Sequence, residues 1–150
     1  MRVREIMSDP VLTVRASLPA EDAWQLMLTR SVRHLVVSEG GRVVGTIGAA
    51  DLGGRIGGSL RTAKTVADLM DCSPVTVAPH DVVRRAANLM RSRHVDCLPV
   101  VDRERLVGIV TLDDLLAVIG GGADRPSHQK RAALHHRVAH KKAMAATGRW

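Results

Sequence analysis

Short apolar runs, polar turns and segments of helical spacing alternate along most of the chain. The clearest stretch is residues 98–116, LPVVDRERLVGIVTLDDLL, in which two runs rich in β-branched residues flank a polar turn. Two such runs joined by four polar residues are typical of a β-hairpin. Because neither run alternates apolar with polar residues, we expect strands that are covered on both faces.

Thr111 and Asp114 follow the second of these strands, at the junction with a helical run that ends at Ile119. A hydroxyl and a carboxylate at this place can cap the helix. They can also face a ligand in the crevice beyond the end of the strand. The sequence leaves both roles open, and the two are compatible.

Two further segments place apolar residues at helical spacing, and each precedes a pair of strands. These are residues 20–28 and residues 82–93, the second with Asp81 as its expected cap. The strands predicted around these helices are residues 12–14, 32–37, 43–47, 75–77, 98–101 and 106–110.

The whole pattern occurs twice, and one constant offset along the chain, without a gap, relates the second copy to the first. So many identities at one offset indicate an internal repeat, which must be recognised before the fold is assigned. The matched pairs include Val3 with Val66, Met7 with Met70, Leu35 with Leu98, Gly45 with Gly108, and Asp51 with Asp114.

We therefore predict an α/β (α+β) fold of two repeats, each strand–helix–strand–strand–helix. The first covers residues 1–58 and the second 66–119, with a polar linker at 59–65 and a basic tail, disordered or helical, at 120–150. A unit of roughly 55 residues buries little core alone. We therefore expect the copies to pack sheet to sheet as a pseudo-twofold pair that shares one core.

Composition limits how this protein can hold a ligand. The chain has 150 residues, of which 45% are apolar, but it has no Phe or Tyr and only two Trp. A flat ligand would therefore be held between aliphatic side chains. The net charge is +7, yet residues 122–150 contain seven Lys/Arg and one Asp, so the tail accounts for +6 of it. The positive charge is therefore concentrated in the tail, and the rest of the chain is close to neutral.

Several weaker signals favour a structural interpretation. Cys72 and Cys97 have no metal-ligand or disulfide spacing and are expected to be small buried or half-buried thiols. The glycine-rich segment 53–58 lacks the Lys-Ser/Thr ending of a phosphate loop and is interpreted as linker. His136 and His140 are four residues apart, but no carboxylate or cysteine joins them, so no metal site is predicted. Without an apolar leader or a run of membrane-spanning length, the protein is expected to be cytoplasmic.

The repeat resembles a known family. VADLMDCSPVTVAPHDVVRRAANLM, LPVVD and LVGIVTLDDLL in the second copy resemble a cystathionine β-synthase (CBS) domain. VREIMSDPVLTV, RHLVV and VVGTIGAADL in the first copy resemble it less closely. Together they resemble a tandem CBS pair, or Bateman module. This implies a homodimeric, non-catalytic regulatory module with no required cofactor, which binds AMP, ADP, ATP or S-adenosylmethionine between its repeats.

The resemblance also implies site residues. In the family pattern Gly, two apolar residues, Ser/Thr, two residues and Asp contact the ribose, and residues 108–114 match it with Thr111 and Asp114. A carboxylate can accept hydrogen bonds from both ribose hydroxyls. Backbone groups and aliphatic side chains would hold the adenine, among them Val75, Thr76, Val95 and Leu98.

The first copy departs from this pattern, because Gly48 stands in the place of Thr111 although Asp51 remains. The family usually has a Pro in the second strand, which Pro99 keeps and Val36 replaces, and the position three before it often carries a basic residue that reaches a phosphate. That position is Arg33 in copy one and Asp96 in copy two. Arg33 and the adjacent His34 would serve the cleft built on Asp114, since Arg suits phosphate through its fork of donors. We thus predict one competent cleft at Asp114 and a degenerate second cleft at Asp51, which Asp96 faces. The alternative for Arg33 and His34 is a solvated strand edge.

A second class of function stays open at this point. The chain would then be a ligand-free dimerisation and protein-interaction module whose basic tail docks an acidic partner. A membrane surface or a merely solvated tail is also compatible with the composition. Nucleic-acid binding is not favoured, because the tail lacks stacking aromatics and a recognition fold. No nucleophile–base pair or metal triad favours an enzyme.

Overall fold

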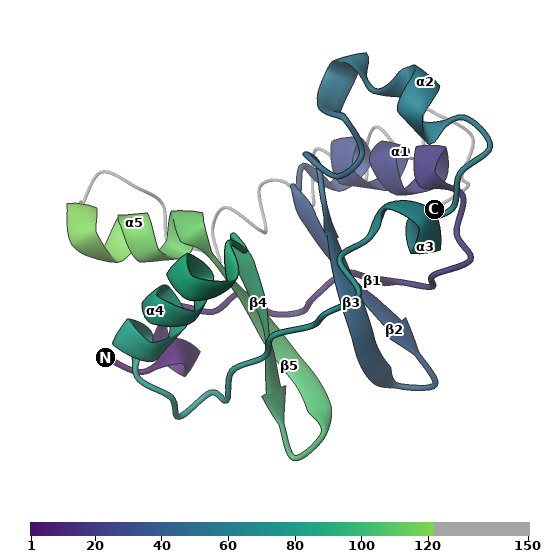
Figure 1. Cartoon of the computed structure of the whole chain (residues 1–150). Coiled ribbons are helices and arrows are strands. Elements are labelled where there is room, and N and C mark those ends of the chain that lie inside the picture. The colour runs from purple at the N-terminus through teal and green to yellow at the C-terminus, as the bar shows by residue number, and fades with distance from the viewer. Residues whose placement is uncertain (122–150) are drawn as a thin grey trace.

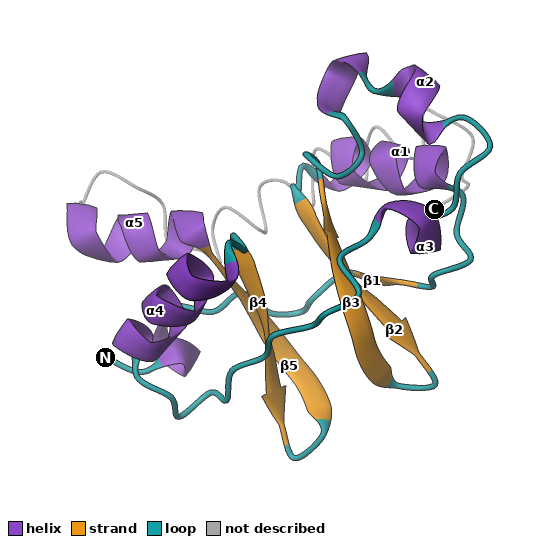
Figure 2. Cartoon of the chain, in the orientation of Figure 1, coloured by secondary structure: helices purple, strands orange, loops and turns teal. Residues whose placement is uncertain are grey.

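The computed structural model describes residues 1–121. The tail from residue 122 onward lies outside the described residues. His136, His140 and the predicted partner-binding role fall on this tail. Figure 1 shows two units side by side, each a small sheet with helices packed against it, and Figure 2 gives the same view by secondary structure. Among the described residues, no helix is long and apolar enough to cross a membrane.

The elements follow the predicted order in the first repeat, and in the second repeat they follow it without the first strand. The first half of the chain contains η1 (Val3–Glu5), β1 (Thr13–Val14), α1 (Ala20–Arg30), β2 (His34–Glu39), β3 (Arg42–Gly48), η2 (Gly54–Ile56) and α2 (Gly58–Arg61). The second half contains α3 (Val66–Leu69), α4 (Val83–Arg93), β4 (Cys97–Asp102), β5 (Arg105–Thr111) and α5 (Leu112–Gly120).

The two sheets differ by one strand. β1 pairs in parallel with β2, which pairs antiparallel with β3, whereas the second sheet contains β4 and β5 alone. The strand predicted at 75–77 is reduced to a single bridge between Val77 and Val100. In the first repeat the Val36 N–H donates to the Leu12 carbonyl at 3.1 Å. Pro99 occupies the equivalent position in the second repeat and has no N–H to donate.

The two long helices end alike, and α4 begins without its predicted cap. Ser31 after α1 and His94 after α4 both adopt the left-handed conformation that commonly ends a helix. Val82, not Asp81, is the N-cap of α4. The Asp81 carboxylate instead accepts a hydrogen bond from the Ala78 N–H at 2.9 Å. This bond tightens the turn before the helix.

The short N-terminal helix of each repeat packs into the other repeat. Val3 of η1 is fully buried in a cluster with α4, β4 and β5, and Val66 of α3 is fully buried in a cluster with α1, β2 and β3. Figure 1 shows η1 beside α4 and α3 beside α1. The buried residues thus form two clusters rather than the single shared core expected from the sequence. Each cluster needs a segment from the other half of the repeat.

The crossing segments are also tied to the sheets by backbone hydrogen bonds. Thr46 in β3 exchanges two with Asp71, at 3.1 and 2.9 Å, and Ile109 in β5 exchanges two with Ser8, at 3.0 and 2.9 Å. Gly45 and Gly108 stand beside these contacts. A Cβ on Gly45 would lie 2.4 Å from the Asp71 carbonyl oxygen. Absence of a side chain is therefore what lets the segment approach the sheet.

The segment predicted as a polar linker carries a buried cation. Arg61, at the end of α2, is 5% exposed. Its guanidinium donates to Glu21 at 2.6 Å and to the carbonyls of Leu52 and Gly54 at 2.8 and 2.7 Å. It also lies 4.6 Å from the ring centroid of Trp24. The fork of donors thus fastens the glycine-rich segment to α1, which a flexible ammonium group would do less well.

We predict that Gly45→Ala lowers the free energy of unfolding by about 1–3 kcal/mol, because the new methyl group overlaps backbone that cannot yield without moving the crossing segment. Gly58→Ala is the matched control, since a Cβ there meets nothing within 4 Å. Urea unfolding of both variants measures the difference. Equal stability of the two variants would contradict the close approach of the crossing segment to β3.

Candidate functional site

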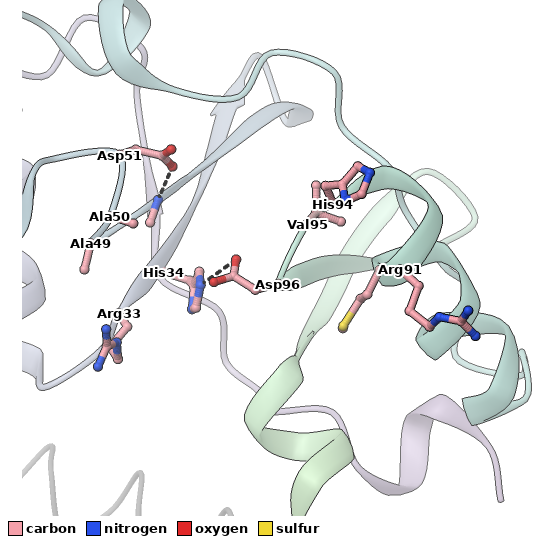
Figure 3. A pocket seen from close by; sticks show the side chains of 11 residues that line it. Arg33, His34, Ala49, Ala50, Asp51, Arg91, His94, Val95 and Asp96 are labelled. Carbon is pink, nitrogen blue, oxygen red and sulfur yellow. Dashed lines mark hydrogen bonds and ion pairs between the residues drawn. The ribbon is translucent and has the colours of Figure 1, made fainter.

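A cavity of about 710 Å³ lies between the two repeats. Figure 3 shows the side chains that line it, which come from both repeats. The first repeat contributes residues 33–34 and 48–51, and the second contributes residues 90–91 and 94–96. The volume is within the range of roughly 300–1,000 Å³ that is usual for small-molecule sites.

The local fold explains why these residues meet. His34 begins β2 and pairs across the sheet with Gly48, the last residue of β3, so the segments before and after the two strands lie together. The Ala49 N–H donates to the Arg33 carbonyl at 2.8 Å. Opposite them, the turn at His94 ends α4 and leads through Asp96 into β4. The cavity is thus at the strand ends, the usual place for a ligand in such sheets.

Asp51 stands at the turn after β3. Its Oδ2 accepts a hydrogen bond from the Gly48 N–H at 2.8 Å. Partial burial of the carboxyl raises its pKa above the ordinary value, and the nearby charges of Asp96 and Asp71 act in the same direction. Part of the Asp51 side chain remains exposed to solvent and to the cavity.

The cavity has mixed charge. Arg33, Arg91, Asp51 and Asp96 all line it, so the formal charges of these four residues cancel. The Nε2 of His34 lies 3.0 Å from Oδ1 of Asp96 and joins the two repeats, as Figure 3 shows. The lining residues thus bring no net formal charge to an anionic group.

Thr111 and Asp114 make the helix cap that was one of their two predicted roles. The Thr111 N–H donates to Asp114 Oδ2 at 2.7 Å, and the Asp114 N–H donates back to the Thr111 hydroxyl at 3.4 Å. Asp114 is 1% exposed. Neither residue lines the cavity at Asp51. Their predicted part in ligand binding stays a prediction.

One group of potential metal ligands also lies here. His34, Asp96 and Cys97 each place a donor atom within 4.8 Å of the other two. Burial raises the pKa of the Cys97 thiol to about 12, and the Thr46 hydroxyl lies within hydrogen-bond reach of it. Cys97 is buried as expected, whereas Cys72 is exposed.

The match to a family decides what kind of module this is. Residues 3–56 and 66–121 each match the family model of the CBS domain. The chain belongs to the CBS domain family. The resemblance seen in the sequence and the predicted α+β pair of repeats are therefore confirmed.

Solved structures support the same conclusion. The CBS domain pair of protein MJ0100, solved in complex with 5′-methylthioadenosine and S-adenosyl-L-methionine, is 27% identical to this chain with a TM-score of 0.73. The match covers 81% of this chain and 97% of that one.

Curated relatives fall into two groups. CBS domain-containing protein YhcV of Bacillus subtilis is 32% identical over 114 residues, which are 75% of this chain and 81% of that protein. Homoserine O-acetyltransferase of Methanohalobium evestigatum is 28% identical over 119 residues, which are 78% of this chain but 24% of that enzyme. The chain thus spans about a quarter of the length of the first curated relatives, and the match covers their CBS part.

Of the four residues predicted to hold the adenine, only one lines the cavity. Val95 lines the cavity of this CBS pair, but Leu98 is fully buried in the second cluster. Val75 packs against that cluster, and Thr76 is exposed. The binding roles of these four residues stay predictions.

The structure groups two of the predicted residues differently from the sequence. Arg33 and His34 line the cavity beside Asp51, and Asp114 is not among the residues that line it. The reason is that β2 and β3 are neighbours, so residues before β2 lie next to residues after β3. The predicted service of Arg33 and His34 to a cleft at Asp114 stays a prediction. Sequence reasoning missed Met90, Arg91 and His94. Their position at the end of α4, directly before Val95 and Asp96, was the available signal.

We predict that the Asp51 carboxyl titrates above its ordinary value of 3.8 and that Asp96→Asn moves its pKa downward. Carboxyl carbon NMR titration measures both. Because the pKa of Asp51 is higher in the folded than in the unfolded state, its ionisation lowers the free energy of unfolding at neutral pH. This destabilisation disappears as the pH falls through the folded-state pKa. Asp68, whose pKa is lowered by hydrogen bonds from Thr65, is the internal control and should not respond. An Asp51 pKa at or below 3.8 would contradict this account.

Proposed function

We propose that this chain is a non-catalytic regulatory module that binds an adenosine-containing ligand in the cleft between its CBS repeats. The observation that carries the proposal is the cavity of about 710 Å³, with a carboxylate at a strand end and cationic groups around it. The complex of the MJ0100 pair with two adenosine compounds, at 27% identity, supports the same ligand class. CBS domains are generally regulatory modules, which fits a non-catalytic role.

Each part of such a ligand has a suitable partner in the cavity. The Asp51 carboxylate would accept hydrogen bonds from the ribose hydroxyls, which a charged acceptor makes strong. The adenine would be held by aliphatic groups such as Val95 and Met90, because the described residues that line the cavity include no aromatic side chain other than histidine. Arg33 would bind an anionic substituent through its planar fork.

The balance of charge bears on which adenosine compound binds. Two arginines and two aspartates line the cavity, so it has no excess of positive charge for a triphosphate. A cationic or uncharged compound loses less hydration free energy than ATP does when it enters the cavity, because each phosphate charge without a cationic partner must give up its hydration. We therefore expect S-adenosylmethionine or 5′-methylthioadenosine to bind more tightly than ATP, with AMP, which carries fewer negative charges than ATP, between them.

Binding would matter as a signal because the cavity is built from both repeats. A ligand shifts an equilibrium only if it binds one conformation more tightly than another. Contacts to Asp51 on one repeat and to Val95 on the other favour the arrangement in which the repeats are correctly spaced. The proposed output is therefore a change in the position of one repeat relative to the other.

We also propose that the chain forms a homodimer through α5. Leu112, Leu116 and Ile119 recur at helical spacing on this helix and are exposed, Ile119 to 82%. A contiguous exposed apolar stripe favours a protein contact. A second copy can cover it by offering the same stripe, as in most symmetric dimers.

For the ligand, we predict that isothermal titration detects binding of at least one compound among AMP, ADP, ATP, S-adenosylmethionine and 5′-methylthioadenosine. Asp51→Asn should weaken it about 10- to 100-fold, because a hydrogen bond to a charged group contributes about 1.5–3 kcal/mol. Asp114→Asn is the matched variant at the equivalent position of the other repeat. Both substitutions preserve an oxygen that can accept the local backbone hydrogen bond.

The two variants separate the cleft seen in the structure from the one predicted by the sequence. Loss of binding in Asp51→Asn alone supports the cavity at Asp51. Loss in Asp114→Asn alone, with unchanged thermal unfolding, would move the ligand to the Asp114 cleft. Absence of heat from every compound, in folded and nucleotide-free protein, would overturn the adenosine proposal.

For the dimer, we predict that Leu116→Glu converts the protein to a monomer at micromolar concentration, because a carboxylate would have to be buried in an apolar contact. Sedimentation velocity measures the mass. Ile56→Glu is the control, since Ile56 is 94% exposed but lies on η2, away from α5. A monomeric wild-type chain, or dissociation by both substitutions, would contradict the proposed interface.

A further inference from the structure

Three side chains with metal-binding atoms meet where the two repeats face each other. His34 begins β2 and Cys97 begins β4, and the two stand at equivalent positions of the repeat, in the same register as Val3 and Val66. The pseudo-twofold arrangement thus brings equivalent positions together, one with an imidazole and the other with a thiol. Asp96, next to Cys97, directs its carboxylate at the same imidazole.

We propose that His34, Asp96 and Cys97 form a binding site for one divalent transition-metal ion of the zinc or cobalt type. Their donor atoms, one from each residue, lie within 4.8 Å of one another. Nitrogen, carboxylate oxygen and thiolate sulfur together are the donors that Zn²⁺ takes in proteins. A thiolate is unsuited to Mg²⁺ or Ca²⁺, which take oxygen ligands.

The geometry needs little adjustment to hold an ion. Around a tetrahedral zinc, with bonds of about 2.0–2.3 Å, donor atoms lie roughly 3.3–3.8 Å apart. The His34 and Asp96 atoms are 3.0 Å apart, and the largest separation in the group is below 4.8 Å. Side-chain movements of about 1 Å therefore suffice to reach the zinc geometry. They involve His34 and Asp96, which are not tightly enclosed, while Cys97 stays fixed in the interior.

The surroundings favour a cation over a simple ion pair. The charges of Asp96, Asp51 and Asp71 all disfavour the thiolate of the buried Cys97 when no cation is present. A divalent ion would compensate this negative charge, whereas one imidazole balances at most one carboxylate. When the ion binds, a metal–sulfur bond forms, the S–H bond breaks and the proton goes to solvent. The fourth position would face the cavity and hold water.

The chain offers a specific test with cobalt. Co²⁺ bound by a thiolate gives a sulfur-to-cobalt charge-transfer absorption in the near ultraviolet, which histidine or carboxylate ligation does not. Cys72 and Cys97 are the only cysteines of the whole chain, so histidines elsewhere cannot produce this band. Titration of reduced full-length protein with Co²⁺ should give the band at one ion per chain, and Zn²⁺ should remove it by competition.

Matched variants assign the band. Cys97→Ser should abolish it, and Cys72→Ser, at the exposed cysteine, should leave it unchanged. His34→Gln should weaken Co²⁺ binding about tenfold or more, while His94→Gln, in the same cavity but outside the cluster, should not. His34→Gln changes a residue at the edge of the cavity and keeps the test valid if Cys97→Ser unfolds. A wild-type chain without the band, or a band that survives in Cys97→Ser or is unaffected by His34→Gln, would overturn the site.

Discussion

The structure depends on the exchange of two short segments. Val3 completes the second hydrophobic cluster and Val66 completes the first, so neither repeat has a full core without the other half of the chain. A unit of this size buries too little surface to be stable alone. The exchange makes the two repeats one cooperative body. It also fixes how the repeats sit against each other, and therefore the shape of the cleft between them.

The sequence predicted most elements, for reasons that can be named. Unbroken apolar runs identified both hairpins, and helical spacing identified α1 and α4, because these patterns follow from which side chains must be buried. The constant offset between matched residues predicted the pairing of repeats. It could not predict the exchange, because Val3 matches Val66 whether each packs in its own repeat or in the other. It also could not show that Arg61, in a segment rich in glycine, is buried.

The site was predicted less completely than the fold. Individual residues such as Arg33, His34 and Asp51 were identified, but their neighbours depend on how two repeats that are distant along the chain face each other. The group of His34, Asp96 and Cys97 shows the difficulty. No short spacing links the first to the other two, so a search for local metal motifs passes over it. Only the pseudo-twofold arrangement brings equivalent positions 34 and 97 together.

The contrast between Asp51 and Asp114 shows how one substitution changes the use of the same motif. Thr111 donates its N–H and hydroxyl to Asp114, at 2.7 and 3.1 Å, and the carboxylate is buried in the helix cap. Gly48 has no hydroxyl and gives Asp51 its N–H, at 2.8 Å. Asp51 is exposed, whereas Asp114 is buried, and Asp51 lines the cavity. In the sequence, Gly48 at the position of Thr111 suggests a lost ligand contact. In the structure, the Asp51 carboxylate beside this glycine is accessible to an incoming group.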